Sequence, residues 1–168
     1  MKMAGFYDES ISNGIGWRAV VFVSGCPHHC PGCHNPQTQD YNYGTEFNKK
    51  EILERIINNP ILKGVTLSGG EPLCKENIGE LLDFVKDLKQ EKPDFNIWCY
   101  SGYTIEQLTA REDKTTQEML ENIDVLVDGQ FILEKKNPTL RFRGSDNQRI
   151  VDVKQTINEH KIVQWGQF

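Results

Sequence analysis

The sequence has no long apolar run, no excess of positive charge and no low-complexity stretch. No apolar run approaches the roughly 20 residues that a membrane-spanning helix requires. The net charge is -5, which argues against nucleic acid or an anionic membrane as an electrostatic partner. The first four residues are not followed by the apolar core of a signal peptide, so we expect a cytoplasmic protein with reduced thiols.

Internal repeats and linkers long enough to separate two domains are also lacking. The chain has 168 residues, of which 38% are hydrophobic, so it can bury a substantial core. We therefore expect one globular domain over residues 1–168.

Cysteine is scarce, but it is concentrated in one place. Three of the five cysteines and three of the four histidines lie within ten residues, Cys26-Pro27-His28-His29-Cys30-Pro31-Gly32-Cys33-His34-Asn35. The apolar, largely β-branched run just before them, residues 18–23, predicts a buried strand. The cysteines then follow the carboxyl end of a strand, where parallel α/β folds build their active sites.

Three thiolates this close together repel one another unless a cation holds them, so the loop predicts a metal centre. Zinc needs a fourth protein ligand, which His28, His29 or His34 could supply. An iron–sulfur cluster normally takes four cysteines, so three would leave one iron open to another ligand. A disulfide fits poorly with an odd number of cysteines in a cytoplasmic chain. The spacing alone leaves the iron–sulfur and zinc interpretations open.

Strand and helix patterns alternate along the rest of the chain. We predict helices that begin near Asn48, cover residues 78–88, begin at Thr104 and span residues 117–122. Residues 5–16 contain several turn formers and predict an entry segment before the first main strand, while residues 162–165 suggest one more strand. The main predicted strands cover residues 17–23, 65–68, 96–100, 125–127 and 150–153. This alternation predicts an open, partial (β/α) barrel with about five parallel strands.

Three motifs carry a resemblance to a known family. The cysteine loop and the turn Gly69-Gly70-Glu71-Pro72 together resemble the radical S-adenosylmethionine superfamily. Residues 24–35 look like the activating enzymes of glycyl radical enzymes. Residues 143–149, Arg-Gly-Ser-Asp-Asn-Gln-Arg, are similar to the activators of anaerobic ribonucleoside-triphosphate reductase. The resemblance covers nearly the whole chain and implies the partial barrel of this superfamily.

The resemblance implies a specific chemistry for the cysteine loop. Cys26, Cys30 and Cys33 would ligate a [4Fe–4S] cluster whose open iron binds the amino and carboxylate groups of S-adenosylmethionine. One electron, from reduced flavodoxin or ferredoxin, would produce a 5′-deoxyadenosyl radical. That radical would remove a hydrogen from a glycine in the large subunit of the anaerobic ribonucleoside-triphosphate reductase. The alternatives are an activator of a different glycyl radical enzyme and a non-catalytic zinc-binding module.

One position departs from the superfamily pattern. The residue before the third cysteine is often aromatic in the superfamily, and here it is Gly32. An aromatic contact with adenine cannot come from this position, and His34 is a candidate substitute.

The Gly-Gly-Glu turn follows the second main strand. Glycines without Cβ atoms allow backbone to approach a ligand closely, so the carbonyls of Gly69 and Gly70 could accept bonds from the methionine ammonium group. Glu71 could add its negative charge. The alternative is an ordinary turn between a strand and a helix.

Several polar residues near other strand ends are candidate ligands of the cofactor. Asp128 and Gln130 should face the same opening as the cysteines, with the Asp128 carboxylate near ribose hydroxyls, or they act as turn and capping residues. Ser101 is a similar case after the preceding strand. Arg143 could bind the methionine carboxylate or the partner protein, or simply pair with surface acids.

The remaining two cysteines are not expected to be ligands. Cys99 lies within a predicted strand, where a buried cysteine behaves as a small apolar residue. Cys74 begins a predicted helix, close to the candidate site but outside the cysteine loop.

Overall fold

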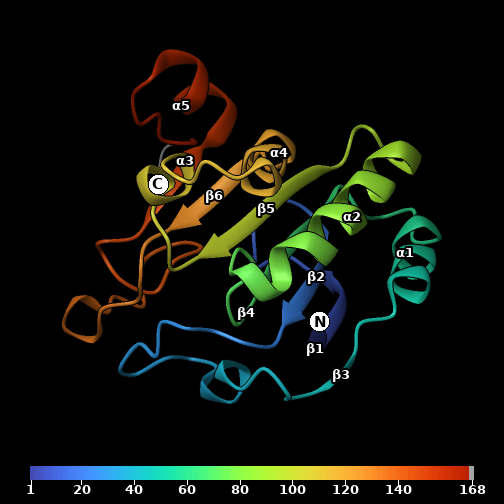
Figure 1. Ribbon diagram of the computed structural model, residues 1–168, viewed down its shortest axis with the longest axis horizontal. Helices are drawn as coiled ribbons and strands as arrows, with labels where there is room; N and C mark the ends of the chain where they lie inside the picture. Colours follow the sequence, from blue (N-terminus) through green and yellow to red (C-terminus); the bar gives the residue numbers. More distant parts are fainter. Residues whose placement is uncertain (167–168) are drawn as a thin grey trace.

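The computed structural model describes residues 1–166, which form one open, seven-stranded sheet with helices packed on it (Figure 1). The strand order is β3-β1-β2-β4-β5-β6-β7. The elements, in chain order, are β1 (Lys2–Ser10), β2 (Arg18–Val23), η1 (Pro36–Gln39), β3 (Thr45–Glu46), α1 (Lys49–Ile57), β4 (Gly64–Gly69), α2 (Lys75–Glu91), β5 (Asn96–Ser101), α3 (Ile105–Thr109), α4 (Lys114–Asn122), β6 (Val125–Asp128), η2 (Leu133–Lys135), β7 (Arg149–Asp152) and α5 (Val153–Glu159).

The centre of the sheet is parallel. Strands β2, β4, β5 and β6 pair in parallel, and the chain returns between them through α1, α2 and then α3 with α4. These crossovers bring the carboxyl ends of all four strands to the same edge of the sheet. The alternation of strands and helices expected from the sequence is confirmed in this region.

The flanks of the sheet correct two expectations. The entry segment expected over residues 5–16 includes part of a strand that was not predicted, because β1 extends to Ser10 and pairs antiparallel with β2. The predicted strand at residues 150–153 exists as β7, but it runs antiparallel to β6. Between β6 and β7 the chain forms only the short 3₁₀ helix η2 and no long crossover. It therefore turns back at the carboxyl edge of the parallel strands and enters β7 in the opposite direction. Among the described residues the parallel strands number four rather than five, and closure into a barrel is not confirmed.

Local signals located the helix starts well. Asn48 caps α1 by accepting a hydrogen bond from the backbone N–H of Glu51, and Thr104 forms a capping box with Gln107 at the start of α3. Helix α5 was not predicted. The tail suggested as a strand makes only an isolated bridge, between Val151 and Gln164.

The two faces of the sheet differ in composition. The main core, including Val21, Leu67 and Leu81, lies between the sheet and its helices, which cover one side in Figure 1. A smaller cluster around Trp98 and Ile150 lies on the other face. No helix within residues 1–166 combines the length and the apolar character needed to span a bilayer.

A buried arginine lies beside the smaller cluster. The Arg18 guanidinium donates hydrogen bonds to the Thr66 hydroxyl and to the carbonyls of Ile15, Val65 and Asn96, at 2.8–3.0 Å. Burial lowers its pKa to about 10. The carbonyl partners compensate for the lost hydration, so Arg18 closes the amino end of the parallel strands and leaves the carboxyl end for the site.

Candidate metal centre

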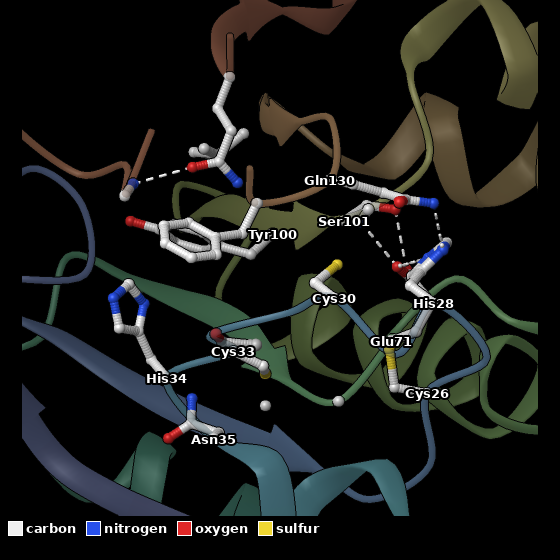
Figure 2. Close-up of a pocket in the computed structure, with 18 of the residues that line it drawn as sticks. Cys26, His28, Cys30, Cys33, His34, Asn35, Glu71, Tyr100, Ser101 and Gln130 are labelled. Carbon is white, nitrogen blue, oxygen red and sulfur yellow. Dashed lines mark hydrogen bonds and ion pairs between the residues drawn. The ribbon is translucent and has the colours of Figure 1, made fainter. Parts of the chain in front are cut away.

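The cysteine loop leaves β2 and borders a cavity of about 410 Å³ at the carboxyl edge of the parallel strands. Cys26, Cys30 and Cys33 all line this cavity (Figure 2). Backbone bonds attach the loop to η1: the N–H of Gly25 donates to Thr38 at 2.7 Å, and that of Cys26 donates to Gln39 at 3.3 Å. The loop is therefore held at its base, and its three thiols face one space.

The Gly69-Gly70 turn packs directly against the base of the cysteine loop. Gly69 has a φ of +99°, and a Cβ added there would lie 2.5 Å from the backbone of Val23. A Cβ on Gly70 would lie 2.4 Å from the carbonyl oxygen of Gly25. Both glycines also line the cavity. The two glycines therefore serve the fold as well as any ligand, because the absence of side chains allows β4 to pack close to the cysteine loop.

Glu71 is fully buried, and its carboxylate is surrounded by donors. Its Oε1 accepts from the Leu73 N–H at 2.9 Å and the Ser101 hydroxyl at 2.8 Å. Its Oε2 accepts from the Gly102 N–H at 2.7 Å and contacts Nε2 of His28 at 2.8 Å (Figure 2). The structure therefore brings Glu71 and Ser101 together as expected for one site, but it uses them to join β4 to β5.

Asn77 on α2 belongs to the same arrangement and was missed in the sequence. Its side-chain amide donates to the carbonyl of Ser24 at 2.9 Å and to that of Glu71 at 3.1 Å. It is almost fully buried in the first turns of a helix, where an amide needs partners. A buried-face asparagine right after the Gly-Gly-Glu turn was the available signal.

The three histidines of the loop have partners other than the thiols. His28 contacts Glu71 and Gln130, His29 contacts the Gln39 side chain at 3.1 Å, and the His34 ring packs on Phe131 with centroids 4.9 Å apart. Within residues 1–166, no three His, Cys, Asp or Glu side chains are arranged to hold a metal ion as they stand. The contacts of these histidines give the Cys₃His zinc site no support.

The donor chemistry of the three cysteines fits a [4Fe–4S] cluster. Burial raises the pKa of Cys26 to about 11, and it also raises the pKa of Cys30. The thiolates that iron requires are therefore disfavoured by burial alone and need the positive charge of bound iron. Cys99 is buried in its strand, as expected, and Cys74 is also buried; neither lines the cavity, so the described chain offers three cysteines there.

Other predicted residues line the same cavity. Gln130, Arg143 and His34 all border it, although His34 precedes the other two by more than 90 residues. The Arg143 guanidinium donates to the Gln148 carbonyl at 3.0 Å, a bond that closes the residue 143–149 motif on itself. Phe131 also lines the cavity and was not singled out from the sequence, although it directly follows Gln130.

Asp128 is placed differently from the expectation. It does not line the cavity, because successive strand residues alternate between faces and it is Val127 that borders the cavity. The Asp128 carboxylate instead accepts from the Ile105 N–H at 2.8 Å and from Nε of Arg149 at 2.9 Å. The capping alternative describes it better than a contact with ribose, since Ile105 is the first residue of α3.

Comparisons with known proteins agree with this geometry. The family described as "4Fe-4S single cluster domain" matches residues 12–151. Proteins named anaerobic ribonucleoside-triphosphate reductase-activating protein are similar over most of their length. The one from Haemophilus influenzae is 41% identical over 156 residues, covering 89% of this chain and 97% of the relative. The one from Pasteurella multocida is 42% identical over 154 residues, covering 89% and 96%.

A viral relative extends the same similarity. The protein of that name from Enterobacteria phage T4 is 38% identical over 147 residues, which cover 86% of this chain and 89% of the relative. The chain belongs to the anaerobic ribonucleoside-triphosphate reductase-activating protein family. Membership, and the match to a 4Fe-4S domain, support an iron–sulfur cluster over zinc at the cysteine loop. The resemblance carried by the cysteine, glycine and residue 143–149 motifs is confirmed.

Proposed function

We propose that this protein is a radical enzyme that activates an anaerobic ribonucleoside-triphosphate reductase. Cys26, Cys30 and Cys33 hold a [4Fe–4S] cluster at the cavity. When bound, the cluster supplies the electron that cleaves S-adenosylmethionine, and the radical so formed removes a hydrogen from a glycine of the reductase. The observation that carries the proposal is that these three thiols share one cavity with the Gly69-Gly70 turn, in a chain of this family.

The cavity residues divide into those that hold the cluster loop and those that face the cofactor. Gly69 and Gly70 present backbone at the carboxyl edge, where their carbonyls would accept from the methionine ammonium group. Gln130, Arg143 and His34 border the remaining space and would contact the nucleotide and methionine carboxylate. Glu71 and Ser101 act through their mutual bond, which fixes the strand ends.

The size and position of the cavity suit a small cofactor and a protein substrate. Its volume, about 410 Å³, lies within the range of small-molecule sites. It opens between the cysteine loop and the β6–β7 segment, which lie side by side beyond the strand ends in Figure 1. A glycine-bearing segment of the reductase would enter there and exclude water from the reactive radical. We propose reduced flavodoxin or ferredoxin as the electron donor and residues 1–168 as a single radical S-adenosylmethionine domain.

The test is formation of a glycyl radical on the reductase. Anaerobically loaded, reduced protein is mixed with S-adenosylmethionine and the reductase large subunit, and the mixture is frozen for electron paramagnetic resonance. We expect a glycine-centred doublet that depends on both S-adenosylmethionine and the activator. A loaded, reducible cluster that gives no doublet would count against the proposed target, and absence of iron from the protein would count against the cofactor.

A further inference from the structure

His28 lies between the first two proposed cluster ligands, and it is fixed by contacts on several sides. Its Nε2 is 2.8 Å from Oε2 of Glu71, and its Nδ1 is 3.1 Å from Nε2 of Gln130. Its ring packs edge-to-face on Tyr103, with centroids 4.5 Å apart. Only 8% of the side chain is exposed. One side chain of the loop thus contacts residues that follow β4, β5 and β6 (Figure 2).

The hydrogen-bond partners assign the tautomer of His28. An ionised carboxylate only accepts, and both oxygens of Glu71 already accept from other donors. Nε2 of His28 must therefore carry a proton and donate it to Glu71. Nδ1 then accepts from the side-chain amide of Gln130, which has the N–H to give. The ring is held as the Nε2–H tautomer, with one donor and one acceptor bond.

The His28 ring also packs closely against backbone. A Cβ added to Gly102 would lie 2.5 Å from the His28 ring, so the backbone of the residue 101–102 turn touches it directly. The neighbouring His29 is held less, because within residues 1–166 its side chain bonds only the Gln39 side chain, at an exposed position. Two adjacent histidines of the same loop therefore provide a clamped residue and a matched control.

We propose that His28 is the positioning residue that holds the cysteine loop in its cluster-ready form before iron arrives, by donating to Glu71. This inference rests on the proposed function only in taking Cys26 and Cys30 as ligands. The loop is attached to η1 at its base through Gly25 and Cys26, and His28 attaches its middle to the strand ends. Without the second attachment, the Cys26–Cys30 segment can move away from the cavity.

The first experiment uses the metal-free, reduced protein and measures alkylation of each cysteine by mass spectrometry. The variants are His28→Asn, whose amide is one methylene too short to replace Nε2, and His28→Gln, whose amide reaches that position. His29→Asn is the control. A charge-assisted hydrogen bond shifts a local equilibrium about tenfold or more. We expect Cys26 and Cys30 to react about tenfold faster in His28→Asn and close to the wild-type rate in His28→Gln and His29→Asn.

The buried Cys74 and Cys99 serve as internal references for global opening. The proposal requires their rates to stay unchanged in His28→Asn while those of the loop cysteines rise. If all five cysteines accelerate together, His28 supports the whole fold and the positioning role is overturned. Equal rates in His28→Asn and His29→Asn would overturn it as well.

The second experiment examines the loaded protein without the reductase. Reduced samples are compared by electron paramagnetic resonance line shape and by cluster midpoint potential. We expect a broadened signal and a shifted potential in His28→Asn, both restored in His28→Gln. Spectra of His28→Asn that match those of His29→Asn would contradict the proposal. Neither readout needs glycyl radical formation, so failure of the proposed target leaves this test intact.

Discussion

Glu71 and Asp128 are two buried carboxylates at the carboxyl edge of the same parallel sheet, and they have opposite surroundings. Asp128 bonds both nitrogens of one edge of the Arg149 guanidinium, which neutralises it. Glu71 is bonded by two backbone N–H groups, a hydroxyl and His28, and no lysine or arginine of the described chain pairs with it. One carboxylate forms a salt bridge with an arginine on the helix side of the sheet, and the other contacts a histidine at the cavity.

The two carboxylates have different roles: Asp128 stabilises the fold, and Glu71 stabilises the site. Asp128 fixes the start of α3, to which Glu106 and Arg149 add an exposed ion pair. Glu71 joins the cysteine loop to the ends of β4 and β5. If this comparison is correct, a substitution of Glu71 should reduce cluster binding. A substitution of Asp128 should lower the free energy of unfolding and leave the cluster in place.

The largest expected effect comes from the cysteine loop itself. Changing Cys30 to Ala removes one of three proposed iron ligands, so the cluster absorbance and glycyl radical formation should both be lost. Iron content and the visible spectrum of anaerobically purified protein measure the first effect. Cys74→Ala is the control, because Cys74 does not line the cavity. Retention of cluster and activity in Cys30→Ala would reject the ligand assignment.

Glu71→Gln should have the next largest effect. The glutamine amide has one oxygen where Glu71 has two, so some of the buried donors around it lose their acceptor. This loss should lower the free energy of unfolding by about 3 kcal/mol. Urea unfolding of the metal-free chain measures this cost. Iron bound per chain after reconstitution should fall too, because the loop loses its attachment. Full iron loading in this variant would break the proposed link between Glu71 and the site.

Asp128→Asn should destabilise the protein without affecting the cluster. Loss of the charged acceptor for Arg149 should lower the unfolding free energy by about 2 kcal/mol. Iron content and the spectrum of the reduced cluster should match the wild type. A cluster defect comparable with that of Glu71→Gln would show that the two carboxylates do not have separate roles.

Glu106→Gln should have the smallest effect. The hydrogen bond with Arg149 lowers the pKa of Glu106 to about 2, from an ordinary value of 4.5. A lowered folded-state pKa stabilises the protein above the unfolded pKa, and this contribution is lost as the pH falls from about 4.5 towards 2. Because the pair is exposed, we expect a difference of about 0.5 kcal/mol at pH 7 that disappears in acid. A difference that persists undiminished below pH 2 would contradict the assignment.

Predictions from local sequence succeeded where the physics is local. The cap at Asn48 and the helix start at Thr104 are confirmed, because a capping side chain needs only the next three residues. The cysteine loop was correctly placed at a strand end because the apolar, largely β-branched run before it strongly favours a buried strand. Predictions were less accurate for features that depend on how strands pair in the sheet. Residue 127 rather than 128 faces the cavity, and β7 runs antiparallel to β6.

The sequence by itself determined the metal-binding loop, the Gly-Gly turn and the helix caps, since their residues are neighbours along the chain. Only the tertiary structure decided that Glu71 would bond His28, 43 residues away, and that Asp128 would bond Arg149. Contacts of that kind depend on which strands pair and which face each residue takes. A carboxylate at a strand end looks the same in the sequence whether it supports the site, as Glu71 does, or caps a helix, as Asp128 does. The register of the sheet determines which of the two roles it has.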